Sequence, residues 1–313
     1  MNADIVSGDY NYLELKNSLV QPFVESVNYL MKQFCIGGKE PVIFSWQTFA
    51  QYNLAVEAVE SGQYKLGKEL IKNVLKHKKG KIRRNFDLVP YSKEFLEADY
   101  DLVQEMLRKD DKGVVAGELT SEALFMLEKE KANKALDIIA AKLPNSEREL
   151  KTFIQEIALC AKSEGYHIRS ASSYYTYGLV LILADEKNTV SYYVEHIIHE
   201  LAHHLLFAYN GADELVLNPS EERFPAPLRD DYRPMFGLFH ALFVLVKSYV
   251  ALDQCKDVLS YNHGENVDDR LMELSDLILN THEIVCDNGI FTKTGEHILS
   301  LITKQMMTLG LRH

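Results

Sequence analysis

The stretch YYVEHIIHELAHHLLFAYNG, residues 192–211, sets four histidines and two glutamates among aliphatic and aromatic residues. Its apolar residues recur at intervals of three and four, which is the period of a helix with a buried face. Thr189, just before the stretch, can cap such a helix, and Gly211 can end it after about Tyr209. The sequence therefore predicts a buried helix that carries ionisable side chains.

Two of these histidines have the spacing of metal ligands. His199 and His203 are four residues apart, so on a helix both imidazoles project from one face. Glu200 completes the HExxH pattern, in which the histidines hold a metal ion and the glutamate acts on a bound water or substrate. The other interpretation is a buried helix with satisfied histidines, but burying two imidazoles and a carboxylate without an ion is costly. For His196 and His204, one turn away, a structural role is the simpler interpretation.

A metal ion on this helix needs a third protein ligand. The chain lacks the longer form of the motif, which has a further histidine after the second one, so the ligand must come from elsewhere. Glu221 and Glu222 would suit a zinc peptidase, but they lie in a proline-rich loop. His240 lies in an apolar stretch that predicts a helix from about Met235 to Leu252, able to pack against the HExxH helix. We therefore expect His240 to be the third ligand, although a lone histidine on an apolar face is ordinarily a core residue.

The first 165 residues predict a helical region of their own. Apolar residues recur at three and four through most of it, and Pro22 should kink or split the first helix. Two amphipathic helices meet at residues 61–63 in an αα-hairpin. A further helix begins near Ser146, which has capping-box spacing to Glu149, and ends at Gly165.

Residues 166–313 predict the metal-binding region. The segment HIRSASSYYTYGLVLILADEKN, residues 167–188, is rich in β-branched and aromatic residues and predicts two short strands that lead into a turn. Helical patterns follow, and the end of the chain from Gly264 to His313 is again helical in pattern. We therefore expect a mainly α protein, with a helical N-terminal region (1–165) and an HExxH region (166–313) that has a small β element.

Composition and charge exclude several classes of protein. With 47% hydrophobic and 25% charged residues the chain has the composition of a globular protein, and its net charge of −11 disfavours nucleic-acid binding. Its apolar runs are shorter than a membrane span and its N-terminus lacks a signal-peptide pattern, so we expect a cytoplasmic protein without a membrane partner. The four cysteines form no CxxC pair and predict neither disulfides nor a cysteine zinc site. A basic segment, Lys76–Arg84, could dock an acidic peptide or could simply be a solvated connection.

The segment after the HExxH helix adds a resemblance to a known family. HELAHH (199–204), followed by FPAPLRDDYRPMFGLFHALFVLVKSYVAL (224–252), resembles the HExxH-motif peptide-modification proteins found beside precursor peptides of bacterial ribosomally made natural products. Their pattern has a proline- and arginine-containing segment, an Arg-Pro, a glycine and a histidine-bearing helix. The matching residues here are Pro227, Arg229, Arg233, Pro234, Gly237 and His240. The resemblance covers roughly residues 170–252 and nothing in the first 165 residues.

Members of this family are described as iron(II)- and 2-oxoglutarate-dependent peptide β-hydroxylases. The resemblance therefore implies a ligand set of His199, His203 and His240 for iron(II). It also implies a guanidinium for the far carboxylate of 2-oxoglutarate, a role that Arg229 or Arg233 could fill. The substrate would be a precursor peptide.

Other interpretations stay open beside this one. In the hydroxylase Glu200 would orient a ligand or water, whereas in a zinc metallopeptidase it would be the general base on a metal-bound water. A peptidase would not need the two arginines, but Arg233 could instead pair with Asp230 or Asp231. A third interpretation is a non-catalytic peptide-binding helical protein that uses the αα-hairpin and the basic segment.

Overall fold

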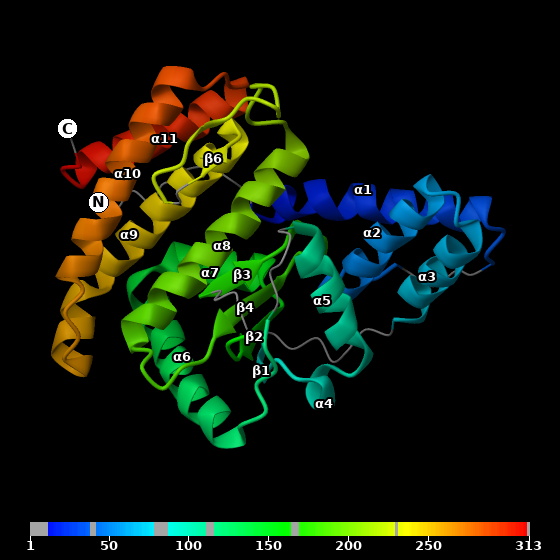
Figure 1. Cartoon of the computed structure of the whole chain (residues 1–313), viewed down its shortest axis with the longest axis horizontal. Coiled ribbons are helices and arrows are strands. Elements are labelled where there is room, and N and C mark those ends of the chain that lie inside the picture. Colours follow the sequence, from blue (N-terminus) through cyan, green and yellow to red (C-terminus); the bar gives the residue numbers. More distant parts are fainter. Residues whose placement is uncertain are drawn as a thin grey trace. The chain divides into compact units, whose positions relative to one another are not determined.

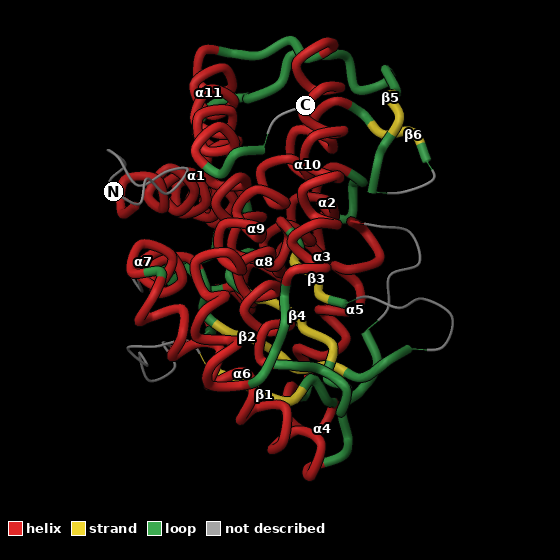
Figure 2. The backbone as a smooth tube through the Cα atoms, turned by 90° about the vertical axis from the view of Figure 1, so that its left-hand side faces the viewer, coloured by secondary structure: helices red, strands yellow, loops and turns green. Residues whose placement is uncertain are grey.

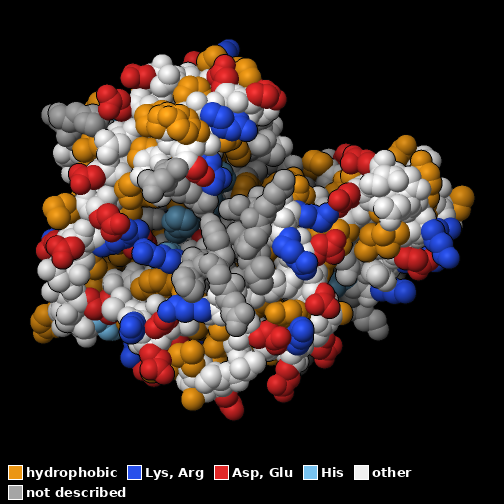
Figure 3. Space-filling model, viewed as in Figure 1, with side chains coloured by type: hydrophobic (Ala, Val, Ile, Leu, Met, Phe, Trp, Pro, Cys, Tyr) orange, Lys and Arg blue, Asp and Glu red, His pale blue; other side chains and the backbone are white. Residues whose placement is uncertain are grey.

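The described part of the chain is mainly helical, as the sequence predicts, and it contains two small β-sheets (Figures 1 and 2). Acidic and basic side chains are interspersed on the face of the molecule that Figure 3 shows. The computed structural model describes residues 12–37, 42–77, 87–110, 116–163, 169–228 and 231–311. Most of the basic segment Lys76–Arg84 lies outside these ranges.

The chain forms two compact units that interleave along the sequence. The sheet unit comprises Lys16–Lys129 and Lys151–Glu186. The HExxH unit comprises Met1–Leu15, Glu130–Leu150 and Lys187–His313.

These units differ from the consecutive regions 1–165 and 166–313 that the sequence suggests. Strand β2 (Glu156–Cys160) precedes residue 165 and β4 (Leu179–Leu183) follows it, yet the two strands pair in parallel. A boundary at residue 165 would cut this sheet, so the chain must return to the HExxH unit only after β4.

The sheet unit is built on a four-stranded sheet in the order β1-β2-β4-β3. β1 (Asp87–Pro90) and β2 are parallel, and β3 (Ser170–Ser172) is antiparallel to β4. The strands Ile157–Cys160 and Leu179–Leu183 are buried along their length, as expected of central strands that are covered on both faces. The remaining elements of this unit are α1 (Tyr12–Gln33), α2 (Trp46–Glu60), α3 (Tyr64–Lys76), α4 (Lys93–Leu96), α5 (Ala98–Asp110) and the short 3-10 helix η1 (Tyr174–Thr176). Of α1, the part from Lys16 onward belongs to this unit.

The predicted αα-hairpin is confirmed. α2 ends at Glu60 and α3 begins at Tyr64, with Gly62 between them at a φ of 75° that favours glycine. Gly67 explains the close approach of the two helices, because a Cβ there would lie 2.9 Å from Cγ2 of Val59.

Two predictions for the first 165 residues are wrong. Helix α7 (Pro144–Phe153) does not continue toward residue 165 but gives way to β2, and β1 lies in a region that was expected to contain only helices and short turns. The cause is that the central strand EIALC has no polar-apolar alternation, so its apolar run resembles a helix core.

Pro22 does not split α1, which is one continuous helix. Gly165, expected to end the helix, lies outside the described residues.

The HExxH unit is a bundle of long helices. The expected helix is present as α8 (Val190–Ala212), which continues through Gly211 to Asp213 at its C-cap. α9 begins at Met235 as predicted but ends at His263, eleven residues beyond Leu252, where Gly264 adopts a left-handed φ of 66°. α10 (Asp268–Asn288), α11 (Lys293–Thr308), most of α6 (Glu122–Lys142) and α7, and a hairpin of β5 (Phe224–Pro225) and β6 (Tyr232–Arg233) complete the unit.

Helix α9 is the core helix of this unit. By length and composition it could cross a membrane, but most of its apolar stretch is buried against the rest of the protein, as is usual for a core helix of a soluble protein. It carries a buried lysine, Lys247, whose Nζ lies 2.7 Å from Oε2 of Glu149 on α7, with side chains only 2% and 1% exposed. This ion pair fixes α9 against α7 inside the unit.

Candidate metal centre

Helix α8 presents the HExxH residues, and its N-terminus is held at two points. The side chain of Thr189 accepts a hydrogen bond from the backbone N–H of Tyr192, as its predicted role as N-cap requires. The carboxylate of Glu265, from the loop between α9 and α10, accepts the N–H groups of Val190 at 2.9 Å and Ser191 at 2.8 Å. Both contacts satisfy backbone N–H groups that the first turn of a helix leaves unpaired. The negative charge of Glu265 is also favourable at this position, because the N-terminus is the positive end of the helix dipole.

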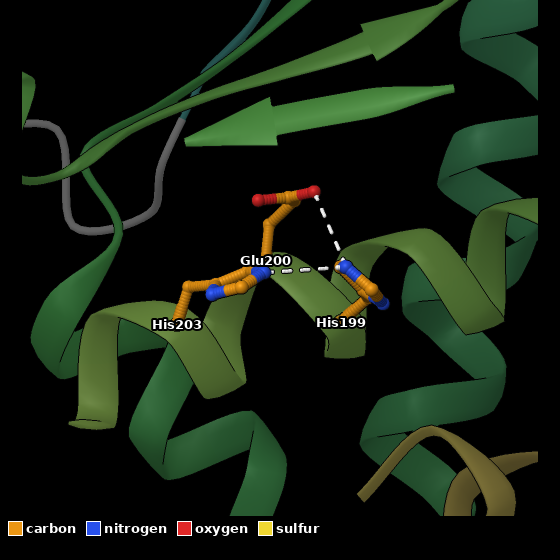
Figure 4. A group of neighbouring side chains, drawn as sticks. All are labelled: His199, Glu200 and His203. Carbon is orange, nitrogen blue, oxygen red and sulfur yellow. Dashed lines mark hydrogen bonds and ion pairs between the residues drawn. The ribbon is translucent and has the colours of Figure 1, made fainter. Parts of the chain in front are cut away.

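The side chains of His199, Glu200 and His203 converge on one space beside α8 (Figure 4). One ligand atom from each lies within 4.8 Å of the others. Nε2 of His199 and Nε2 of His203 are 3.3 Å apart. Two nitrogen atoms that each lie about 2.0–2.1 Å from one tetrahedral metal ion are separated by about 3.3–3.4 Å. The pair therefore has the spacing that a shared ion requires.

His240 of α9 contacts this cluster through His203, but it is not among the three residues whose ligand atoms lie within 4.8 Å of one another. Its Nε2 lies 2.8 Å from Nδ1 of His203, a hydrogen bond in which one of the two nitrogens carries the proton. A half-turn of the His203 ring about Cβ–Cγ exchanges Nε2 with Cε1, the ring atom between the two nitrogens. In that orientation Nε2 of His203 would occupy the present place of Cε1, between the ring position that faces His199 and the one that faces His240. In the orientation of the structure, His240 instead contacts Nδ1 of His203, the ring nitrogen that does not face His199.

Burial keeps these imidazoles in their neutral form. It lowers the pKa of His199 to about 3, with smaller contributions from His196, His240 and Arg270. Burial likewise holds the pKa of His203 and of His240 well below the usual value, with the neighbouring imidazoles adding to the effect. A neutral imidazole is the form that binds metals, so the cluster needs no deprotonation at neutral pH.

Glu200 and His199 differ in their access to solvent. The Glu200 side chain is 2% exposed, whereas 32% of the His199 side chain is exposed, and Oε1 of Glu200 lies 4.0 Å from Nε2 of His199. The cluster therefore has an open side at His199 and a buried carboxylate on another side. A water or substrate atom that entered from the open side would meet both groups.

The two neighbouring histidines of α8 have other contacts. Nδ1 of the buried His204 donates to the backbone oxygen of Glu200 at 2.9 Å, and burial lowers its pKa to about 4. The ring of His196 packs against Tyr192, with 4.2 Å between the ring centroids. Both contacts agree with the structural role that the sequence suggests for these histidines.

The glutamates at 221 and 222 lie outside the group of ligand atoms in the described part of the chain, and Arg233 has a partner on its own hairpin. Nε of Arg233 donates to Oδ2 of Asp231 at 2.8 Å on the β5–β6 hairpin, which is the structural pairing considered above. Arg229 and Asp230 lie outside the described residues. Glu221 accepts from Ser220, and both carboxylates considered as third ligands, Glu221 and Glu222, are exposed.

Sequence reasoning missed an ion pair beside the cluster. Arg270 of α10 binds Glu195, which precedes His199 by one turn of α8. The two residues are 75 positions apart, and no local pattern connects them. The only available signal was a carboxylate in an otherwise buried stretch, because a buried carboxylate requires a partner.

No family model matches the chain, and no curated protein is similar to it. The donor set therefore has to be judged by its own chemistry. Two or three neutral imidazoles, with a carboxylate close by, fit a divalent transition metal such as iron or zinc better than magnesium or calcium, which prefer oxygen ligands.

Proposed function

We propose that this protein is an iron(II)- and 2-oxoglutarate-dependent hydroxylase that acts on a side-chain β-carbon of a ribosomally made precursor peptide, in the cytoplasm. The observation that carries the metal centre is the convergence of His199, Glu200 and His203, with the Nε2 atoms of the two histidines 3.3 Å apart, while His240 lies 2.8 Å from the other ring nitrogen of His203. The choice of oxygen chemistry rests on the resemblance of residues 199–204 and 224–252 to the peptide-modification family.

The three histidines would hold the iron, two from α8 and one from α9. When bound, iron(II) and 2-oxoglutarate activate dioxygen, of which one oxygen atom enters the peptide C–H bond and the other enters succinate, with release of carbon dioxide. The buried Glu200 would orient a water or ligand by accepting its hydrogen bond. The far carboxylate of 2-oxoglutarate would bind Arg229 or Arg233, as in the resemblance.

The half-open cluster suits this use of the site. Most of its wall is buried, which limits the entry of water, while the exposed edge of His199 leaves a path for a peptide side chain. The lack of charge on the imidazoles leaves the positive charge of the ion available to bind a dicarboxylate.

A zinc metallopeptidase is the second candidate, and one observation favours it. Oε1 of Glu200 lies 4.0 Å from Nε2 of His199, so the carboxylate would be near a water on an ion held by His199 and could act as its general base. In that reaction Glu200 would be essential and 2-oxoglutarate irrelevant.

One pair of assays separates the two candidates. With iron(II), 2-oxoglutarate and oxygen, the proposed hydroxylase forms succinate, and a peptide substrate gains the mass of one oxygen atom. Cleavage of peptides with zinc alone, unaffected by 2-oxoglutarate and abolished by Glu200→Gln, would establish the peptidase instead. Loss of metal from His199→Ala and His203→Ala, measured by elemental analysis, is required by both.

A further inference from the structure

Arg270 has one edge of its guanidinium fixed by a buried carboxylate. Its Nε lies 3.0 Å and 3.1 Å from the two carboxylate oxygens of Glu195, and its Nη2 lies 2.5 Å from Oε1. Glu195 is buried, whereas 27% of the Arg270 side chain is exposed. A bidentate contact of this kind sets the plane of the guanidinium as well as its position.

This arginine stands beside the HExxH cluster. Glu195 and His199 are four residues apart on α8, so their side chains leave neighbouring positions on one face, with a rise of about 6 Å between them. Arg270, bound to Glu195, therefore places a permanent positive charge next to His199.

The other edge of the guanidinium has a weaker partner. Nη1 donates to Oε2 of Glu273 at 2.6 Å, but the Glu273 side chain is 61% exposed. An exposed pair between residues three apart on a helix contributes little, because water competes for both groups. Among the described residues, Glu195 and Glu273 are the partners of Arg270, which leaves one N–H on each terminal nitrogen without an acceptor.

We propose that Arg270 forms a carboxylate-binding subsite next to the HExxH cluster. A ligand carboxylate replaces Glu273 at the terminal nitrogens, while Glu195 keeps the guanidinium in place. The subsite needs little reorganisation to bind, since only an exposed side chain has to move.

The carboxylate has two possible sources with the same chemistry. One is the far carboxylate of a dicarboxylate cosubstrate, which Arg270 would then bind in place of Arg229 or Arg233, and the other is the C-terminal carboxylate of a peptide. The inference relies on the proposed metal centre for its location, but not on which reaction that centre performs.

Titration calorimetry on the full chain tests the subsite. The protein is loaded with zinc(II), which does not react with oxygen, and its metal content is measured separately. The probes are 2-oxoglutarate, N-acetyl-dialanine and N-acetyl-dialanine amide, so that the first two supply the two kinds of carboxylate and the third supplies none. We expect one of the first two to bind and the amide not to bind.

Two variants make the test specific, and circular dichroism checks that each is folded. Arg270→Lys keeps the charge but loses the bidentate edge, so the dissociation constant of the bound probe should rise at least about tenfold. Glu273→Gln removes the competing carboxylate, so the same constant should fall. Lys256→Gln is the matched control, because it removes a cation from an exposed pair with Asp268. It should leave the dissociation constant of the bound probe unchanged.

Equal affinities, within twofold, in wild type, Arg270→Lys and Glu273→Gln would overturn the subsite, as would a wild type that binds neither carboxylate probe. A loss of 2-oxoglutarate binding in Arg229→Gln or Arg233→Gln, with none in Arg270→Lys, would place the carboxylate at the hairpin instead. If the protein takes up no zinc and its carboxylate binding still depends on Arg270, the metal centre is refuted and the subsite stands.

Discussion

Nδ1 of His203 on α8 and Nε2 of His240 on α9 lie 2.8 Å apart, so the two central helices of the HExxH unit meet through a pair of imidazoles. His203 is also the neighbour of His199 on its other nitrogen. The three rings are thus linked through His203, and each position can be tested by its effect on metal binding.

His240→Ala should weaken metal binding by more than about 100-fold, because loss of an outer partner alone costs about 10- to 100-fold and loss of a direct ligand costs more. A competition titration with a metal-sensitive dye measures the affinity. His204→Ala is the matched control, since His204 is also a buried histidine, on α8, but contacts the Glu200 backbone. An equal and small loss in both variants would place His240 outside the metal site.

Removal of Lys247 should destabilise the fold without touching the cluster. Lys247→Met leaves the buried Glu149 without its cation, which costs roughly 3–5 kcal/mol in the free energy of unfolding. Urea denaturation measures this, and Lys256→Met, from an exposed pair, should change stability by less than about 0.5 kcal/mol. If Lys247→Met unfolds at the same urea concentration as wild type, the ion pair does not hold α9 and α7 together.

Glu265 should stabilise the start of the HExxH helix. Glu265→Ala removes the acceptor of two backbone N–H groups and a favourable charge at the helix N-terminus, at a cost of about 1–2 kcal/mol. Hydrogen exchange should then speed up in the first turn of α8. Glu283→Ala, an exposed glutamate of α10, should have no such effect. Unchanged exchange at residues 190–193 would contradict the capping role.

The metal-free protein should lose stability in mild acid. Burial lowers the pKa of His204 in the folded chain from 6.5 to about 4, so between these values the unfolded chain binds a proton that the folded chain does not. Stability from this residue is therefore present above pH 6.5 and is lost as the pH falls to about 4, up to roughly 3 kcal/mol. The urea concentration at the midpoint of unfolding should fall less steeply with decreasing pH in His204→Leu than in the wild type. An identical pH profile in the two proteins would show that His204 does not contribute.

Much of the HExxH unit follows from local patterns. The Thr189 cap and the apolar stripe of α8 can both be recognised in the sequence. The four-residue spacing of His199 and His203 places their side chains next to each other on a helix, as observed. The start of α9 at Met235 is equally local. The position of His240 against His203 depends on how two helices pack, which the sequence suggests only through their apolar character.

The errors have a common physical origin. β2 and β1 are strands because parallel neighbours supply their hydrogen bonds, and such partners leave no periodic signal in a short apolar run. The extension of α9 to His263 passes through polar residues that its buried stripe does not predict. The pairs of Arg270 with Glu195 and of Lys247 with Glu149 join residues 75 and 98 positions apart, so only the folded chain brings them together.

Anomalous diffraction from crystals grown with iron(II) or zinc(II) tests the metal centre most directly. The account predicts one strong peak at the metal edge per chain, about 2.0–2.2 Å from a ring nitrogen of each of His199, His203 and His240. No peak at these residues, or a peak whose ligands lie elsewhere in the chain, would contradict it.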